Sequence, residues 1–166
     1  MSVTEERKLR IDFADPYMTI GQTILINKKH KGVVTSYKDL NDSKYIVTSK
    51  PATTGEQAVK KFMPKSTYQP FDTELEGAMA VIKGQADAFV YDMPYNVVFV
   101  AMHGADKLIL LDKPFTTEPL AWAIRKNDPD FLNWLNKFLD EIKKDGRYDK
   151  IYKKWFKSTD WFRYVR

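Results

Sequence analysis

Between residues 22 and 115, short apolar runs alternate with segments of helical spacing, and this alternation constrains the fold more than any other feature. The apolar runs are typical of strands, because several are rich in β-branched and aromatic side chains and polar or turn residues bound them. They lie at residues 24–26, 45–48, 67–71, 88–91 and 108–111. Strands that alternate with helices of about 8–12 residues indicate βαβ units. The sequence therefore predicts an α/β fold with a largely parallel sheet.

Local signals mark the ends of the helices in this region. Residues 53–56 open one helix, which Pro64 stops, and Asp72 or Thr73 caps the next helix. Asp92 follows the strand at 88–91 and precedes Pro94, whose missing N–H costs nothing in a first helical turn. Asp92 is thus a predicted N-cap, and it lies at the carboxyl end of a strand.

Beyond residue 120 the alternation gives way to helical patterns. Residues 127–129 cap a long helix that Gly146 ends, and its apolar side chains are predicted to form one face. The members of this face are Phe131, Leu132, Leu135, Phe138, Leu139 and Ile142. A shorter helix is predicted over residues 148–156, with three side chains turned inward: Ile151, Tyr152 and Trp155.

The composition argues against several kinds of functional site. The chain has no cysteine, which excludes disulfides and thiolate metal sites, and His30 and His103 do not support a histidine-rich metal site. Phosphate-binding glycine loops and the motifs of serine hydrolases and zinc peptidases are absent. We therefore expect neither a metal nor a cofactor.

The sequence shows neither a membrane-spanning segment nor a signal peptide. No apolar run approaches the ~20 residues needed to span a bilayer. The first residues, MSVTEER, lack the apolar core of a signal peptide. If the protein is exported, we expect that its signal has been removed or lies outside this sequence.

The net charge of +5 comes from the C-terminal part of the chain. Residues 1–120 carry 15 basic and 15 acidic side chains, whereas residues 121–166 carry 12 and 7. A basic tail can indicate nucleic-acid binding, and the other interpretation is the solvated face of amphipathic helices. Acidic residues such as Asp140 and Asp145 interrupt the basic ones. We favour the solvated face and expect no nucleic-acid partner.

Four stretches of the sequence match the pattern of one protein family. They are MSVTEER with IDFADPY at residues 1–7 and 11–17, TTGE at 53–56, GQADAFVYD at 84–92, and DGRYDKIYKKWF at 145–156. Each stretch alone is a weak or moderate signal, but their order and spacing are specific and cover nearly the whole chain. On these stretches the sequence resembles the polar-amino-acid family of periplasmic solute-binding proteins of ABC transporters.

The resemblance implies a two-lobed α/β fold of the periplasmic-binding-protein type (type II), with a ligand cleft between the lobes. Residues 22–115 are similar to the complete second lobe, and residues 1–21 and 116–166 to part of the first lobe with the hinge strands. In the family, most of the first lobe's sheet precedes the position of Met1. About half a lobe is therefore expected to be missing, with the aromatic residues that usually sandwich the ligand side chain.

In the first lobe, the resemblance implies ligand-binding roles for Arg7 and Ser2. Arg7 matches the arginine that holds the ligand's α-carboxylate, and a guanidinium suits this task because it donates two parallel hydrogen bonds. The alternative for Arg7 is a surface ion pair with Glu5 or Glu6. Ser2 matches the hydroxyl beside this arginine, and its alternative is an ordinary serine at a strand end.

In the second lobe, the resemblance implies roles for Thr54, Gly55, Asp92 and Tyr91. Thr54 and Gly55 precede a helix, whose free N–H groups favour an anion, and glycine lets a ligand approach the backbone. A plain threonine N-cap is the alternative. Asp92 would accept hydrogen bonds from the ligand's ammonium, in addition to or instead of capping a helix. Tyr91 either lines the cleft or fills the core.

The resemblance favours a binding protein that delivers a small amino acid to an ABC-transporter permease, in the periplasm or outside the cell, without catalysis. One alternative is an enzyme of the cyclohexadienyl dehydratase type on the same fold. Another is a shortened fragment that does not bind a ligand alone. Because the apolar face of the long helix lacks part of the sheet that would cover it, we expect a dimer, a domain swap or a need for a complementing N-terminal segment.

Overall fold

The chain passes twice between two structural units. The computed structural model describes residues 1–104, 106–158 and 160–161. Unit 1 combines the two ends of the chain, Met1–Thr19 and Pro119–Arg166, and unit 2 comprises Ile20–Glu118. Each unit has its own packing and is described by itself.

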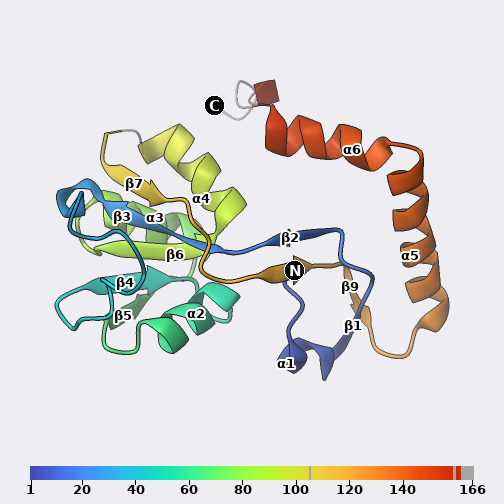
Figure 1. The fold of residues 1–166 in the computed structure, drawn as a ribbon. Coiled ribbons are helices and arrows are strands. Elements are labelled where there is room, and N and C mark those ends of the chain that lie inside the picture. Colours follow the sequence, from blue (N-terminus) through green and yellow to red (C-terminus); the bar gives the residue numbers. More distant parts are fainter. Residues whose placement is uncertain (105, 159, 162–166) are drawn as a thin grey trace. The chain divides into compact units, whose positions relative to one another are not determined.

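Unit 2 is built on a five-stranded sheet with the order β5-β4-β6-β3-β7 (Figure 1). The strands are β3 (Gln22–Asn27), β4 (Ile46–Ser49), β5 (Thr67–Pro70), β6 (Ala88–Asp92) and β7 (Leu108–Leu111). β4 runs parallel to β5 and β6, whereas β3 runs antiparallel to both β6 and β7. The sheet is therefore mixed, which corrects the expectation of a largely parallel sheet. β3 is the exception because the chain enters it from the edge at which the other strands end.

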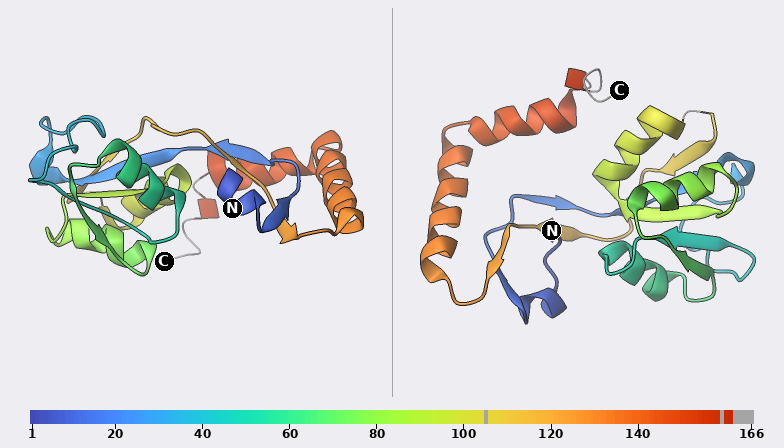
Figure 2. Two further views of the ribbon diagram at one scale, coloured as in Figure 1. Left: turned by 90° about the horizontal axis from the view of Figure 1, so that it is seen from below. Right: turned by 180° about the vertical axis from the view of Figure 1, so that it is seen from behind.

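Helices cover both faces of this sheet (Figures 1 and 2). α2 (Thr54–Phe62) packs on one face, and α3 (Glu74–Ile82) and α4 (Met93–Phe99) pack on the other. β3 supplies apolar side chains to both layers, because Ile24 and Ile26 belong to the core on the α2 side and Leu25 to the core on the other side. Burial on both faces explains why this strand is a continuous apolar run.

The helix ends of unit 2 follow from local sequence. The Thr53 side chain accepts a hydrogen bond from the backbone N–H of Glu56 and caps α2. Thr73, rather than Asp72, caps α3 in a reciprocal capping box with Glu76. Short turns complete the unit, a 3-10 turn at Lys28–His30 and a π-helical turn at Val100–Gly104 that continues α4.

Unit 1 contains one short antiparallel strand pair and two larger helical segments, and a second strand pair lies at its boundary with unit 2. β1 (Ile11–Phe13) pairs with β9 (Ala123–Arg125), and β2 (Met18–Ile20) pairs with β8 (Glu118–Leu120) at the two crossings. The helices are α1 (Glu5–Lys8), α5 (Pro129–Lys144) and α6 (Arg147–Tyr152), and a π-helical turn at Lys153–Lys157 follows. A small buried cluster of Ala14, Ile124 and Leu135 forms the core of this unit.

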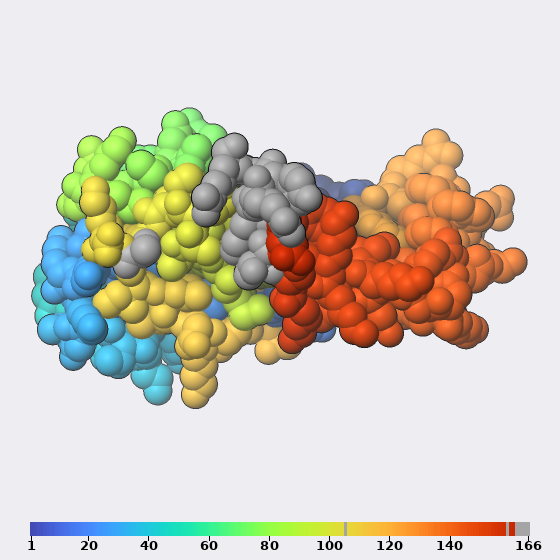
Figure 3. Space-filling view, turned by 90° about the horizontal axis from the view of Figure 1, so that it is seen from above, coloured from blue at the N-terminus to red at the C-terminus, as the bar shows by residue number. Residues whose placement is uncertain are grey.

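The apolar face predicted for α5 is only partly buried. Leu135, Leu139 and Ile142 are buried, but Phe131 remains 45% exposed, and Trp134, which the predicted face did not include, is 58% exposed. Phe131, Trp134 and Phe138 stack in sequence along the helix, with neighbouring ring centroids 6.1 and 5.6 Å apart. The surface of α5 and α6 is seen in Figure 3.

The inward orientation predicted for three side chains of the helix at residues 148–156 is wrong for two of them. Ile151 is 53% exposed and Trp155 is 46% exposed. The regular helix ends at Tyr152 and continues as a π-helical turn, so the helical spacing assumed for residues 148–156 is not maintained. In the described part of unit 1, no larger sheet lies beneath α6 to bury these side chains.

Candidate ligand-binding site

The polar residues predicted in unit 2 gather at one edge of its sheet. β3 begins where β6 ends, because the two strands are antiparallel and Gln22 pairs with Asp92 in their register. The backbone N–H of Met93, the first residue of α4, donates to the carbonyl oxygen of Gly21 at 3.0 Å. This edge therefore brings together the start of β3, the end of β6 and the start of α4. In open α/β sheets, the carboxyl ends of parallel strands are where ligands bind.

Gln22 occupies the centre of this edge and connects the two predicted parts of the site. Its side-chain Nε2 donates to Oδ1 of Asp92 at 2.7 Å and to Oγ1 of Thr54 at 3.3 Å. The residue is fully buried. Sequence reasoning missed Gln22, although a polar residue that opens the apolar run TILI was a signal that could have identified it.

Asp92 does not cap α4 with its side chain. It occupies the N-cap position of that helix, but its side chain makes no capping hydrogen bond. The carboxylate instead accepts the hydrogen bond from Gln22. Of the two tasks considered for Asp92 in the sequence, side-chain capping is therefore not observed.

Thr54 and Gly55 are the first two residues of α2, and Thr53 supplies the cap. Gly55 is buried, and a Cβ atom at this position would lie 2.5 Å from Oγ of Ser49 and 2.9 Å from the carbonyl oxygen of Val90. Such distances leave no room for a side chain. Close packing of α2 on the sheet is thus a sufficient reason for glycine, independent of any ligand.

Tyr91 is packed into an aromatic cluster. Its ring stacks on Phe89 at 5.5 Å and meets the edge of Tyr95 at 5.2 Å between centroids. Burial, together with the charges of Glu74 and Asp92, raises the pKa of Tyr91 to about 12. The side chain contributes to the core, so core packing, one of the two alternatives considered for Tyr91, is observed, and its hydroxyl remains protonated at neutral pH.

An ion pair joins the segments that follow β4 and β5. Nζ of Lys50 is 2.8 Å from Oε2 of Glu74, the first residue of α3. The Lys50 ammonium lowers the pKa of Glu74 through this hydrogen bond. Neither residue was predicted from the sequence, because their proximity depends on the strand order.

The predicted residues of unit 1 contact each other through the backbone. Nη1 of Arg7 donates to the carbonyl oxygen of Ser2 at 2.8 Å, and Ser2 is buried where it bridges to Leu120. Arg7 lies in α1, whose N-cap, Thr4, accepts a hydrogen bond from the Arg7 backbone N–H. Glu5 forms an ion pair with Lys8 at 2.7 Å. The structure thus places the Arg7 guanidinium beside the Ser2 backbone.

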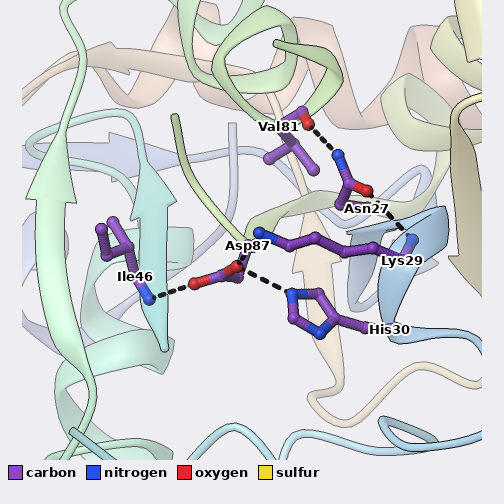
Figure 4. Close-up of polar contacts among 6 residues, drawn as sticks. All are labelled: Asn27, Lys29, His30, Ile46, Val81 and Asp87. Atoms are coloured by element: carbon purple, nitrogen blue, oxygen red, sulfur yellow. Dashed lines mark hydrogen bonds and ion pairs between the residues drawn. The ribbon is translucent and has the colours of Figure 1, made fainter. Parts of the chain in front are cut away.

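Asp87, the other acidic residue of the segment GQADAFVYD, lies at the opposite end of β6 (Figure 4). Its carboxylate accepts from the Ile46 backbone N–H at 2.8 Å and lies 2.8 Å from Nζ of Lys29 and 2.7 Å from Nε2 of His30. Burial opposes ionisation, but the Ile46 N–H, Lys29 and His30 together lower the pKa of Asp87. Asp87 therefore joins the starts of β4 and β6 to the end of β3, a structural role.

The described residues contain no group of three or more His, Cys, Asp or Glu side chains that could hold a metal ion. Within the same residues, no helix is long and apolar enough to cross a membrane.

Comparison with known proteins identifies the family. The chain belongs to the bacterial extracellular solute-binding proteins, family 3, because the model of this family matches residues 1–158. The resemblance seen in the sequence is thereby confirmed. The chain is 35% identical over 159 residues to the glutamine-binding protein of an ABC transporter from Bacillus subtilis. This match covers 95% of the chain and 56% of the relative.

Solved structures agree with this assignment. A protein from Wolinella succinogenes, assigned as the binding component of an ABC transporter and complexed with lysine, superposes with a TM-score of 0.93 at 44% identity, over 98% of this chain and 70% of that chain. An ancestral amino-acid-binding protein, a precursor of cyclohexadienyl dehydratase, matches with a TM-score of 0.87 at 45% identity, over 94% and 66%. The predicted fold class is confirmed. The chain spans little more than half the length of the relative from Bacillus subtilis.

Proposed function

We propose that the protein binds a small amino acid through its α-carboxylate and α-ammonium groups and delivers it to an ABC-transporter permease. The observation that carries the proposal is the hydrogen-bonded cluster of Gln22, Thr54 and Asp92 at the carboxyl edge of the sheet. Relatives at this level of similarity are named for binding glutamine or are complexed with lysine. We accordingly propose a periplasmic or extracellular location, as in the family.

The cluster offers complementary groups for a zwitterion. Asp92 supplies a carboxylate for the ammonium, and the hydrogen bond from Gln22 orients it. A carboxylate has about four acceptor positions. Thr54 accepts from Gln22 and has a hydroxyl hydrogen that can be donated to a carboxylate. The start of α2, a helix of 9 residues, adds the positive end of the helix dipole.

The proposal assigns the α-carboxylate also to Arg7 of unit 1. A guanidinium can donate two parallel hydrogen bonds to a carboxylate. Arg7 belongs to unit 1 and Asp92 to unit 2. We propose that unit 2 corresponds to the second lobe of the family, at residues 22–115, and unit 1 to part of the first.

We propose binding without catalysis. A dehydratase needs a general acid at the site. Glu74 is a second carboxylate whose charge, like that of Asp92, raises the pKa of Tyr91. Its ion pair with Lys50 lowers the pKa of Glu74, so Glu74 is a poor proton donor at neutral pH. Continued consumption of an added carboxylic acid by the protein would contradict this part of the proposal.

Titration calorimetry of the chain against the twenty amino acids tests the proposal directly. We expect heat from a small set of them, and loss of that heat in Asp92→Asn and Arg7→Met. Removing one partner of a desolvated charge pair typically costs ~2–5 kcal/mol, which corresponds to roughly tens to thousands of times in affinity. Matched controls are Asp112→Asn and Lys8→Met, which change exposed side chains of the same units. No binding by the wild-type chain, or equal binding by all variants, would reject the assignment.

A further inference from the structure

Gln22 joins the candidate site to the segment that leads out of unit 2. Its backbone N–H donates to Oγ1 of Thr116 at 2.8 Å, and the Thr116 hydroxyl donates to Oε1 of Glu118 at 2.8 Å. The Gln22 carbonyl oxygen accepts from the N–H of Phe115 at 3.1 Å. Glu118 is buried and begins β8 at the second crossing of the chain. The main chain of Gln22 is thus held by residues 115–118.

The side-chain amide of Gln22 turns its Nε2 group toward the candidate site. Its Nε2 donates to both Asp92 and Thr54. Its Oε1 is buried and has no hydrogen-bond partner among the described residues. An unsatisfied buried carbonyl oxygen costs folding free energy. The charge-assisted hydrogen bond from Nε2 to the Asp92 carboxylate offsets this cost.

Packing already holds the crossing segment without this side chain. A Cβ atom at Gly21 would lie 2.2 Å from the carbonyl oxygen of Thr116 and 2.7 Å from Cβ of Pro114. The two chain segments therefore approach as closely as a glycine allows. The Gln22 amide is not needed for that contact, and what it adds is the orientation of Asp92 and Thr54.

We infer that Gln22 is a positioning residue for the proposed ligand site, which fixes the Asp92 carboxylate and the Thr54 hydroxyl and ties both to residues 115–118. The inference rests on the proposed function. It predicts that Gln22 acts through Asp92, because groups fixed before binding lose less conformational freedom when the ligand arrives. Gln22 itself need not touch the ligand.

A double-mutant cycle tests this coupling. Gln22→Met keeps the length of the side chain and removes both donors. With an amino acid that the wild-type chain binds, we expect Gln22→Met to weaken binding roughly tenfold, the loss of about one hydrogen bond to a charged group. In an Asp92→Asn background, titrated at ligand concentrations high enough to measure the weakened binding, the same substitution should have little further effect, because the effects of substitutions at two interacting residues do not add. Thr116→Val, which leaves the Gln22–Asp92 bond intact, serves as the comparison and should weaken binding less.

A second measurement does not need a ligand or a Gln22 variant. In a ¹⁵N-labelled wild-type chain, the Nε2 protons of Gln22 should exchange slowly with solvent, and Asp92→Asn should shift their resonances while Asp112→Asn should not. Additive effects in the cycle, or an Nε2 group that exchanges rapidly and ignores Asp92, would overturn the inference. If the wild-type chain binds none of the twenty amino acids, the proposed function fails instead, and the exchange measurement still decides whether Gln22 orients Asp92.

Discussion

Ile46 and Asp87 are joined twice at the starts of two parallel strands. The backbone N–H of Asp87 donates to the carbonyl oxygen of Ile46 at 2.8 Å, and the Asp87 carboxylate accepts from the N–H of Ile46, also at 2.8 Å. A side chain thus continues the hydrogen bonding between β4 and β6 beyond the end of the ladder (Figure 4). The same carboxylate is in contact with Lys29 and His30, which follow β3.

The first prediction concerns the stability of this junction. Asp87→Asn keeps an acceptor for Ile46 but removes the charge that faces Lys29, so a buried polar group is left poorly matched. We expect the free energy of unfolding to fall by roughly 1–3 kcal/mol. Denaturant unfolding followed by far-UV circular dichroism measures it, with Asp112→Asn as the exposed control. An unchanged midpoint would show that the junction contributes little.

A second prediction concerns pH. The pKa of Asp87 is lowered in the folded protein, so the unfolded chain binds more protons at acidic pH. The resulting stabilisation is complete above the unfolded value of about 3.9 and is lost as the pH falls through the folded pKa. Unfolding free energies measured from neutral to acidic pH should therefore decline less steeply for Asp87→Asn than for the wild type. Parallel curves would contradict the assignment.

The third prediction concerns Gly55. Gly55→Ala places a methyl group against Oγ of Ser49 and the carbonyl oxygen of Val90, so α2 must shift from the sheet. Overpacking of this kind typically costs about 1–3 kcal/mol. Lys61→Ala, at an exposed position of the same helix, is the control. Wild-type stability of Gly55→Ala, measured by thermal unfolding, would show that the backbone yields easily there.

The fourth prediction is that unit 2 folds alone. It has a complete sheet with a core on each face, and these cores are formed by residues of unit 2. A fragment of residues 20–118 should show a cooperative thermal transition. A fragment of residues 20–104 should not, because β3 loses its pairing with β7. The absence of a transition in the longer fragment would mean that unit 2 depends on the rest of the chain.

A fifth prediction concerns association. Phe131 and Trp134 form an exposed stacked pair on α5, and exposed apolar patches favour contact with other molecules. We expect the chain to self-associate at high concentration and to bind a hydrophobic dye. Trp134→Lys should reduce both, whereas Asn133→Lys, which adds the same charge at an exposed polar position, should not. Light scattering that reports a monomer without dye binding would refute this expectation.

Features that depend on neighbours in the chain could be predicted from the amino-acid sequence. The helix start at residues 53–56 was predicted, and so was a cap at Asp72 or Thr73; the observed caps are Thr53 and Thr73. Such signals are local, because capping is a contact between residues three positions apart. The strands of unit 2 were likewise located by their apolar runs. Asp92 was identified from its place at a strand end and from the family pattern.

Contacts between residues distant in the chain could not be predicted in this way and are seen in the folded protein. The bond from Gln22 to Asp92 spans 70 positions, and the bond from Gln22 to Thr116 spans 94. The antiparallel direction of β3 follows from the edge at which the chain enters the sheet, and apolar spacing is the same in either direction. Spacing shows that one side of α5 is apolar, but the exposure of Phe131 and Trp134 depends on what packs against that side.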